Sequence, residues 1–248
     1  MSTDVLTKFY TYLLTEKCVS PNTFSAYKRD IEQFMDYVTK QELHLNNLTI
    51  INVKGFLRYL KEELALSARS VTRKISCLKV LFTFMHDRFG SQDLAQDLTF
   101  PKLEKKLPNY LNEDEIKSLL LATQSDVSDV GLRNKVIIYL LYVSGMRISE
   151  LVNLQISHLH FDTGFIDVLG KGGKMRMVPV PQPIFGLLKN YLITVHARFT
   201  QNGKRSTDYL FPIFYAGKVK AITRQAVWGI LKHICASSGI EKSIFPHQ

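Results

Sequence analysis

Residues 165–180 have the sequence FIDVLGKGGKMRMVPV, in which two apolar runs flank a glycine-rich segment. Residues 165–169 and 175–180 are rich in the β-branched, aromatic and long apolar side chains that occur in strands. The glycines of 170–174 supply the backbone freedom that a tight turn needs. The stretch therefore predicts an antiparallel hairpin with a glycine-rich turn.

Helices are expected on both sides of this hairpin, because apolar residues there recur at helical spacing. Asn112 followed by Glu115 is a capping-box pattern, which starts a helix through Leu120. Residues 134–144 are nearly all apolar and predict a buried helix that Gly145 ends. Three more helices are expected, over 147–154, 183–197 and, after Thr223 as N-cap, 224–237.

The first ninety residues predict four helices. The second of them starts at Ser20 as N-cap, with Pro21 in the first helical position, and continues through Val38. The fourth covers 67–88, and its apolar side chains fall on one stripe: Val71, Ile75, Leu78, Phe82 and Met85.

The opposite face of helix 67–88 is basic. It holds Arg69 and Arg73, with Lys79 beside them, and the helix has five basic residues against one acid, Asp87. An ordinary solvated face is one interpretation, but such a face usually mixes the two signs of charge. The bias therefore favours a polyanionic partner.

A charged segment bounded by prolines, PKLEKKLP at 101–108, follows these helices. Proline cannot continue a helix and restricts the residue before it, so this segment is the expected linker. It divides the chain into a helical domain at 1–100 and a second domain at 109–248. The predicted fold is thus mainly α with a small antiparallel β-sheet, in two domains.

The chain is basic, and its charge is unevenly placed. It carries 32 Lys and Arg against 22 Asp and Glu, a formal net charge of +10. Residues 1–100 have 13 basic and 11 acidic side chains, whereas residues 101–248 have 19 and 11. The excess favours nucleic acid, because each phosphate contact releases condensed counterions. An anionic membrane surface and simple solubility are the alternatives.

The sequence disfavours several other classes of protein. The three cysteines lie far apart without a Cys/His cluster, which predicts buried thiols in a reducing compartment and neither disulfides nor a metal site. The first residues lack the pattern of a secretory signal, and the longest apolar run, 136–143, is too short to span a bilayer. A soluble, cytoplasmic protein is expected. Residues 170–174 do not have Walker A spacing, which disfavours an NTPase.

Two basic residues near glycines are candidate catalytic residues. Arg147 follows Gly145 and is expected in the first turn of a helix, where backbone N–H groups and the guanidinium suit a phosphate. Glu150 lies on the same face and can orient that guanidinium. Lys171, in the hairpin turn, can bind a phosphate or donate a proton to a leaving oxygen. A surface Arg–Glu pair and an ordinary turn lysine are the alternatives.

Several short motifs occur in one order along the chain. In the first domain they are SPNT at 20–23 and TRK at 72–74; in the second they are GMRISEL at 145–151, GKGGKMRMVP at 170–179, FP at 211–212, TRQ at 223–225 and FPH at 245–247. In this combination the chain resembles the tyrosine recombinases of the phage integrase family, the Xer type in particular, over nearly its whole length. Its N-terminal helices are similar to the family's SAM-like core-binding domain.

The resemblance implies strand exchange on DNA without a metal or nucleotide cofactor. In such enzymes two arginines clamp the scissile phosphate, and a tyrosine attacks it to form a 3′-phosphotyrosyl link. A hairpin lysine protonates the departing 5′ oxygen, and histidines assist proton transfer. On this pattern Arg147 is the first arginine, Glu150 its neighbouring acid, Lys171 the leaving-group acid and His247 the first histidine.

The resemblance also implies a double-stranded DNA recombination site as partner, and no membrane. We expect a C-shaped clamp, with helices 20–38 and 67–88 on one side of the DNA and the second domain on the other. Family members act as tetramers on two duplexes. Chromosome-dimer resolution and movement of a mobile element are both compatible with the motifs. The expected DNA contacts are Thr23, Tyr27, Arg69, Arg73, Lys74, Lys79, Lys174, Arg176, Thr223 and Arg224.

In the family, a second arginine, a later His or Trp, the nucleophilic tyrosine and a subunit-docking segment all follow the first histidine. The sequence ends at Gln248, one residue after His247, and Tyr191, Tyr209 and Tyr215 precede that histidine. These 248 residues are therefore expected to hold an incomplete catalytic domain and to form no covalent DNA adduct. A DNA-binding protein without catalysis is the alternative function. An RNA-binding helical protein is a third, disfavoured by the lack of an aromatic RNP-type strand.

Overall fold

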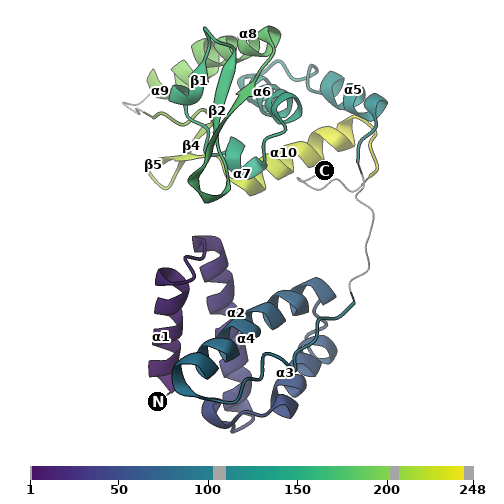
Figure 1. The fold of residues 1–248 in the computed structure, drawn as a ribbon. Helices are drawn as coiled ribbons and strands as arrows, with labels where there is room; N and C mark the ends of the chain where they lie inside the picture. The colour runs from purple at the N-terminus through teal and green to yellow at the C-terminus, as the bar shows by residue number, and fades with distance from the viewer. Residues whose placement is uncertain (1, 103–109, 202–206, 243–248) are drawn as a thin grey trace. The chain divides into compact units, whose positions relative to one another are not determined.

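The computed structural model describes residues 2–102, 110–201 and 207–242. The chain divides into two compact units, Met1–Lys106 and Leu107–Gln248 (Figure 1). Most of the predicted linker, 101–108, lies outside the described residues. Within the described parts, no helix combines the length and apolarity needed to cross a bilayer.

The described residues of the first unit form the four predicted α-helices and one 3₁₀ turn. Ser20, Thr49 and Ser67 each cap a helix with their side-chain oxygens. Gly90 takes the left-handed conformation, at φ 65°, that ends the fourth helix. The elements are α1 (Ser2–Thr15), α2 (Pro21–Lys40), η1 (Leu45–Asn47), α3 (Ile50–Glu62) and α4 (Ala68–Phe89).

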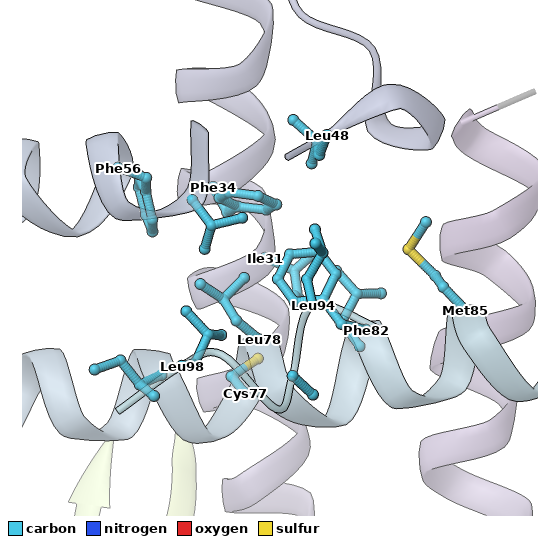
Figure 2. Packing of buried hydrophobic residues seen from close by; sticks show 14 of the residues in the cluster. Ile31, Phe34, Leu48, Phe56, Cys77, Leu78, Phe82, Met85, Leu94 and Leu98 are labelled. Carbon is cyan, nitrogen blue, oxygen red and sulfur yellow. The ribbon is translucent and has the colours of Figure 1, made fainter. Parts of the chain in front are cut away.

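Helix α4 is the centre of the first unit, because it contacts α1, α2 and α3. Its predicted apolar stripe is buried, and so are Cys77, Leu81 and Phe84, which lie outside that stripe. Figure 2 shows the core that α4 shares with its neighbours, including Phe34 of α2 and Phe56 of α3. Helix α4 is thus enclosed over more of its circumference than the sequence pattern indicates.

The three cysteines are unpaired and differ in exposure. Cys77 in α4 and Cys235 are buried, and burial raises the pKa of both thiols. Cys18, which follows α1, is exposed, so the expectation of three buried thiols is wrong at this position. It sits in the loop between two helices, at a positive φ of 46°.

The described part of the second unit is also mostly helical. Asn112 and Glu115 form the predicted capping box, and Thr223 caps the last helix. Helix α6 starts earlier than predicted, after Ser128 as N-cap, and its last turn is not buried, because Tyr142 is 56% exposed. The elements are α5 (Glu113–Ala122), α6 (Asp129–Ser144), α7 (Ile148–Leu151), η2 (Ile156–His158), α8 (Gln182–Tyr191), the π-helical turn η4 (Leu192–His196), α9 (Ala197–Gln201) and α10 (Arg224–Ser237).

The predicted hairpin is present and belongs to a three-stranded antiparallel sheet. Strands β2 (Phe165–Leu169) and β3 (Met175–Pro179) pair along their length, and β1 (Leu159–His160) pairs with the other edge of β2. In the turn η3 (Lys171–Gly173), Gly172 and Gly173 have φ angles of 78° and 75°. Side chains rarely adopt such angles, which explains the glycines of this turn.

A second hairpin was not predicted. Strands β4 (Pro212–Tyr215) and β5 (Lys218–Ala221) pair antiparallel and form a two-stranded sheet. The strand β5 alternates lysine with Val219 and Ala221 over four positions, which is too short a pattern to identify a strand. The described residues thus hold two small antiparallel sheets instead of one.

One buried cluster in the second unit supports both α7 and the β2–β3 hairpin. It contains Ile166 and Val168 of β2, together with Ile148 and Leu151 of α7. Helix α6 contacts both α7 and α8, and Phe185 of α8 belongs to the same cluster. The elements that carry Arg147 and Lys171 are therefore fixed on a common core.

Candidate active site

Arg147 lies at the junction between α6 and α7. Gly145 ends α6 in the left-handed conformation, at φ 57°, and the buried Met146 anchors the chain after it. Arg147 is the N-cap of α7, not a residue of its first turn as expected. Its backbone N–H donates to Oε2 of Glu150 at 2.8 Å, so this donor is not free for a phosphate. Its side chain is 59% exposed, which leaves the guanidinium accessible.

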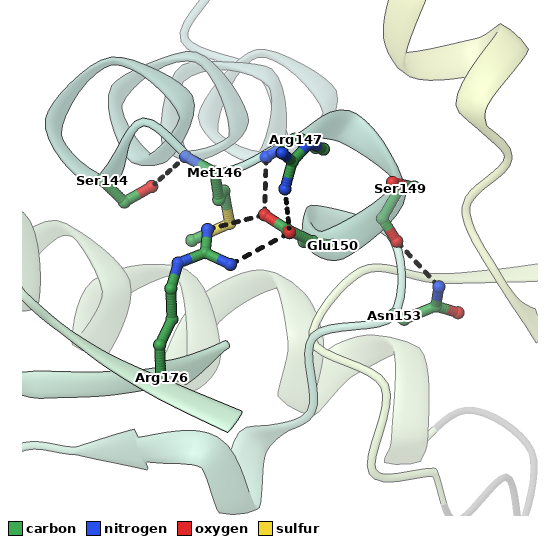
Figure 3. Close-up of polar contacts among 7 residues, drawn as sticks. All are labelled: Ser144, Met146, Arg147, Ser149, Glu150, Asn153 and Arg176. Carbon is green, nitrogen blue, oxygen red and sulfur yellow. Dashed lines mark hydrogen bonds and ion pairs between the residues drawn. The ribbon is translucent and has the colours of Figure 1, made fainter. Parts of the chain in front are cut away.

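The carboxylate of Glu150 holds two guanidinium groups (Figure 3). Its Oε1 accepts from Nη1 of Arg147 at 3.0 Å and from Nη1 of Arg176 at 3.0 Å, and its Oε2 accepts from Nη2 of Arg176 at 2.7 Å. Arg176 therefore binds the carboxylate in the bidentate manner that suits a planar guanidinium. We call Arg147, Glu150 and Arg176 the Glu150 cluster.

The Glu150 cluster has a fixed charge. Hydrogen bonds from Arg176, and then from Arg147, lower the pKa of Glu150 to about 2, although burial of the carboxylate acts in the opposite direction. Its side chain is only 4% exposed. Glu150 is thus ionised at neutral pH, and two guanidinium groups with one carboxylate leave a net charge of +1.

Gly170 brings the hairpin close to this cluster. A Cβ atom at Gly170 would lie 3.3 Å from Nη1 of Arg176 and 3.2 Å from the carbonyl oxygen of Lys174. The absence of a side chain at Gly170 therefore permits the close approach of the Lys174 carbonyl and the Arg176 guanidinium to Gly170. Lys171, the next residue, begins the turn, and the structure describes its backbone only. His247 lies outside the described residues.

The tyrosines that precede His247 differ in accessibility. Tyr191 is buried, its hydroxyl donates to the carbonyl oxygen of Leu210 at 3.0 Å, and burial raises its pKa. Tyr209 is half-buried, whereas Tyr215 is exposed on β4. A nucleophilic phenol has to reach a phosphate, and Tyr191 is enclosed in the core. In the described residues, no group of three His, Cys, Asp or Glu side chains is arranged to hold a metal ion.

Comparison with known proteins identifies the family. Residues 109–248 match the phage integrase family, and residues 6–88 match the N-terminal SAM-like domain of phage integrases. The chain belongs to the phage integrase family. It is 36% identical to the tyrosine recombinase XerD of Listeria monocytogenes serovar 1/2a and 32% identical to that of Staphylococcus aureus strain N315. Each alignment covers 98% of this chain and 81% of the relative.

Solved structures agree with this membership at the level of the fold. The XerH recombinase bound to palindromic difH, in a post-cleavage complex, matches 90% of this chain and 65% of its own, with a TM-score of 0.71 and 22% identity. A lambda integrase dimer bound to a COC′ core site matches 97% of this chain and 64% of its own, with a TM-score of 0.67 and 15% identity. Phage integrase folds thus account for both helical units.

The expected DNA contacts in the second unit of this phage integrase lie on two elements. Lys174 and Arg176 belong to the hairpin; Lys174 is exposed, while both Nη atoms of Arg176 are bound to Glu150. Thr223 accepts the backbone N–H of Ala226 at 3.1 Å as the cap of α10, and Arg224 is exposed beside it. Arg176 is therefore an internal partner of the active site, although 40% of its side chain remains exposed.

The expected contacts in the first unit lie on α2 and α4. Thr23 and Tyr27 lie on α2, and Arg69 and Lys79 lie on α4; Arg69 is exposed, whereas Tyr27 and Lys79 are half-buried. Lys79 has its ammonium 5.3 Å from the centre of the Phe100 ring. These residues, together with Arg73, remain candidates for phosphate contacts.

Lys74 requires a correction. It was expected to contact DNA, but it is buried, and its ammonium donates to Oδ1 of Asp30 at 2.7 Å. Its neighbour Arg73 donates through Nη1 to the other oxygen of the same carboxylate and, at 3.3 Å, to the carbonyl oxygen of Ala26. Because a buried ammonium needs its counterion, Lys74 is part of the core and not of the surface.

Asp30 is the residue that the sequence analysis missed. It is 3% exposed and lies on α2 next to Ile31, one turn before Phe34, so it stands at the edge of the apolar face of that helix. An acid at such a position is a detectable signal, because carboxylates are almost never fully buried unless they are paired. The sequence of α2 alone does not indicate that the partners of Asp30 are Arg73 and Lys74 of α4.

Proposed function

We propose that this phage integrase performs site-specific DNA recombination by cleaving and rejoining strands through a 3′-phosphotyrosine. The observation that carries the proposal is the Glu150 cluster, which lies against the hairpin that holds Lys171. Its net positive charge and the accessible guanidinium of Arg147 suit a scissile phosphate, on which negative charge increases during attack. The curated relatives named above are tyrosine recombinases, which supports the same reaction.

Each catalytic residue has a proposed role in this reaction. Arg147 binds the non-bridging oxygens of the phosphate, and Glu150 holds Arg147 in place. When a tyrosine oxygen bonds to the phosphorus and the bond to the 5′ oxygen breaks, Lys171 protonates that departing oxygen, and His247 assists proton transfer. The sequence of steps uses side chains alone, and no metal or nucleotide enters it.

The proposed partner is a duplex DNA recombination site, which both units contact and which is acted on in the cytoplasm. The net charge of +10 supports a polyanion, and the solved relatives include a XerH bound to difH and a lambda integrase tetramer bound to a Holliday junction. Tetramer assembly on two duplexes is part of the proposal. The proposed contacts are Thr23, Tyr27, Arg69, Arg73, Lys79, Lys174 and Arg224, with Thr223 as the cap that places Arg224.

A finer proposal concerns the 248 residues by themselves. We propose that they occupy the site without cutting it, because the second arginine and the nucleophilic tyrosine of the family pattern are not among them. The enclosed hydroxyl of Tyr191 supports this, since it is already bound to Leu210. Such a polypeptide would act as a DNA-binding fragment that blocks the site.

One experiment tests the DNA-binding function and the finer proposal. The 248-residue polypeptide is used to select bound sequences from a random duplex library, and the selected duplex is then nicked and incubated with it. We expect salt-sensitive binding, and no protein–DNA adduct on a denaturing gel. A phosphotyrosyl adduct would overturn the finer proposal, and binding that is unchanged by salt would overturn the DNA-binding function itself.

A further inference from the structure

Asp30, Arg73 and Lys74, which we call the Asp30 cluster, contain one positive charge more than negative. Lys74 is 8% exposed, so its ammonium and the Asp30 carboxylate balance each other inside the first unit. Arg73 is 44% exposed, and its Nη1 is bound by Asp30 and by Ala26. Its Nη2 and Nε make no hydrogen bond to any other described residue. The excess charge therefore lies on the outer edge of a guanidinium whose inner edge is anchored.

An anchored guanidinium is well prepared to bind an anion. A free arginine loses side-chain entropy when it is immobilised by a ligand, but Arg73 is already held by a buried carboxylate and a backbone carbonyl. The planar guanidinium has donors on two edges, so one edge can bind Asp30 while the other binds a phosphate. A lysine ammonium carries its three donors on one atom, so it has no separate outer edge to present to a phosphate while it binds Asp30.

The surroundings of Arg73 favour a polyanion over a single small anion. Arg69 lies one turn earlier on the same helix and is exposed, so Arg69 and Arg73 place two positive charges close together on one face of α4. The backbone of a DNA duplex offers phosphates along its length, and can therefore meet both arginines.

We propose that Asp30 is a positioning residue for DNA binding: it presents the outer edge of Arg73 to a backbone phosphate, while Lys74 balances its charge within the core. This inference rests on the proposed DNA-binding function. It assigns a role to a buried acid that touches no DNA, and it explains why two cations of α4 meet one carboxylate of α2.

The test measures binding of the 248-residue polypeptide to a fluorescein-labelled random duplex at several salt concentrations. Arg73→Gln is expected to weaken binding about tenfold at low salt and to lower the slope of log K against log salt by about 1. The pair Asp30→Asn and Lys74→Gln removes one charge of each sign, so net charge is unchanged. If Asp30 positions Arg73, this double variant should bind DNA more weakly than the wild type. If Asp30 acts only through long-range electrostatics, the double variant should bind DNA as the wild type does.

A double-mutant comparison separates positioning from general damage. In the background of the Asp30→Asn and Lys74→Gln pair, Arg73→Gln should weaken binding by a smaller factor than in the wild type. Arg69→Gln is the matched control, because Arg69 lies on the same helix and makes no ion pair within the described residues; its effect should be the same in both backgrounds. Equal effects of Arg73→Gln in both would overturn the inference.

Arg73→Lys keeps the charge and leaves the buried pair intact, so it provides a test if the paired variant does not fold. It should bind DNA nearly as weakly as Arg73→Gln. Wild-type affinity of Arg73→Lys would show that charge alone suffices and would overturn the role of Asp30. If Arg69→Gln weakens binding while every Arg73 variant binds normally, the inference fails and the DNA-binding function stands. If the unmodified polypeptide does not bind duplex at all, the proposed function fails.

Discussion

The two units each contain a carboxylate that binds two cationic side chains, but the two clusters differ in how deeply the cations are buried. In each, one buried carboxylate on one element binds two cations, and the sum is one positive charge. In the Glu150 cluster both guanidinium groups remain exposed, at 59% and 40%, whereas in the Asp30 cluster one of the two cations, Lys74, is itself in the core.

This difference separates two uses of an ion pair. The Glu150 cluster joins a hairpin to a short helix at the surface, where its arginines can meet a ligand. The Asp30 cluster joins α2 to α4 in the interior and leaves one arginine outside. Breaking either cluster should therefore lower the free energy of unfolding, and the loss should be larger for the Asp30 cluster, where a buried cation is left without its counterion.

The largest effect is expected for Asp30→Asn. This change leaves the Lys74 ammonium buried without a counterion, and we expect the free energy of unfolding of the first unit to fall by about 3–5 kcal/mol. Native-state hydrogen exchange of the α4 amides measures the loss. The control replaces the pair by apolar residues, Asp30→Leu with Lys74→Met, which should recover most of the stability. A loss below about 1 kcal/mol for Asp30→Asn would contradict the comparison.

Glu150→Gln should give the next largest effect, with a defined pH dependence. The pKa of Glu150 in the folded protein, about 2, is below its ordinary value of 4.5. Its contribution to the free energy of unfolding is therefore fully present above about pH 4.5 and is lost as the pH falls toward 2. We expect the variant to be less stable than the wild type by on the order of 3 kcal/mol at neutral pH.

Urea unfolding followed by Trp228 fluorescence measures this effect, because Trp228 is the one tryptophan of the sequence and lies in the second unit. The difference in the free energy of unfolding between the wild type and Glu150→Gln should become steadily smaller below pH 4.5. Asp162→Asn, at an exposed turn position without an ion pair among the described residues, is the control and should show no such trend. A difference that stays constant down to pH 2 would argue against an ionised, hydrogen-bonded Glu150.

Gly170→Ala should have the smallest effect of the three. The new Cβ would press on the Lys174 carbonyl and on Arg176, and overpacking of this kind lowers the free energy of unfolding by about 1–2 kcal/mol. Gly186→Ala in α8 is the control, since nothing lies within 4 Å of its Cβ position, and a gain of about 0.4–1 kcal/mol is expected there. The same Trp228 unfolding assay applies, and an equal change in the free energy of unfolding for both glycines would mean that Lys174 and Arg176 do not pack tightly against Gly170.

Local signals in the sequence predicted much of the fold. Ser20, Asn112 and Thr223 cap their helices because a short polar side chain accepts a backbone N–H just ahead of a helical run. Gly172 and Gly173 marked the first hairpin, because the positive φ angles of its turn favour glycine. These features depend on neighbours within a few residues, which a linear pattern contains.

The features that were missed depend on contacts between distant segments. Lys74 looks like a surface residue until α2 brings Asp30 against it, 44 residues away in sequence. The same holds for Arg176, whose guanidinium is bound to Glu150, 26 residues earlier. In the candidate site, the pairing of Arg147 with Glu150 was predictable from helical spacing, whereas the second guanidinium was not.

The unequal exposure of the cysteines gives the chain a convenient labelling chemistry. Cys18 is open to a maleimide dye, while Cys77 and Cys235 are enclosed and their thiolates are disfavoured. Cys18 belongs to the first unit and Trp228 to the second. An acceptor dye on Cys18 and the native indole therefore form a donor–acceptor pair with one member in each unit, and energy transfer between them can follow DNA binding without any substitution.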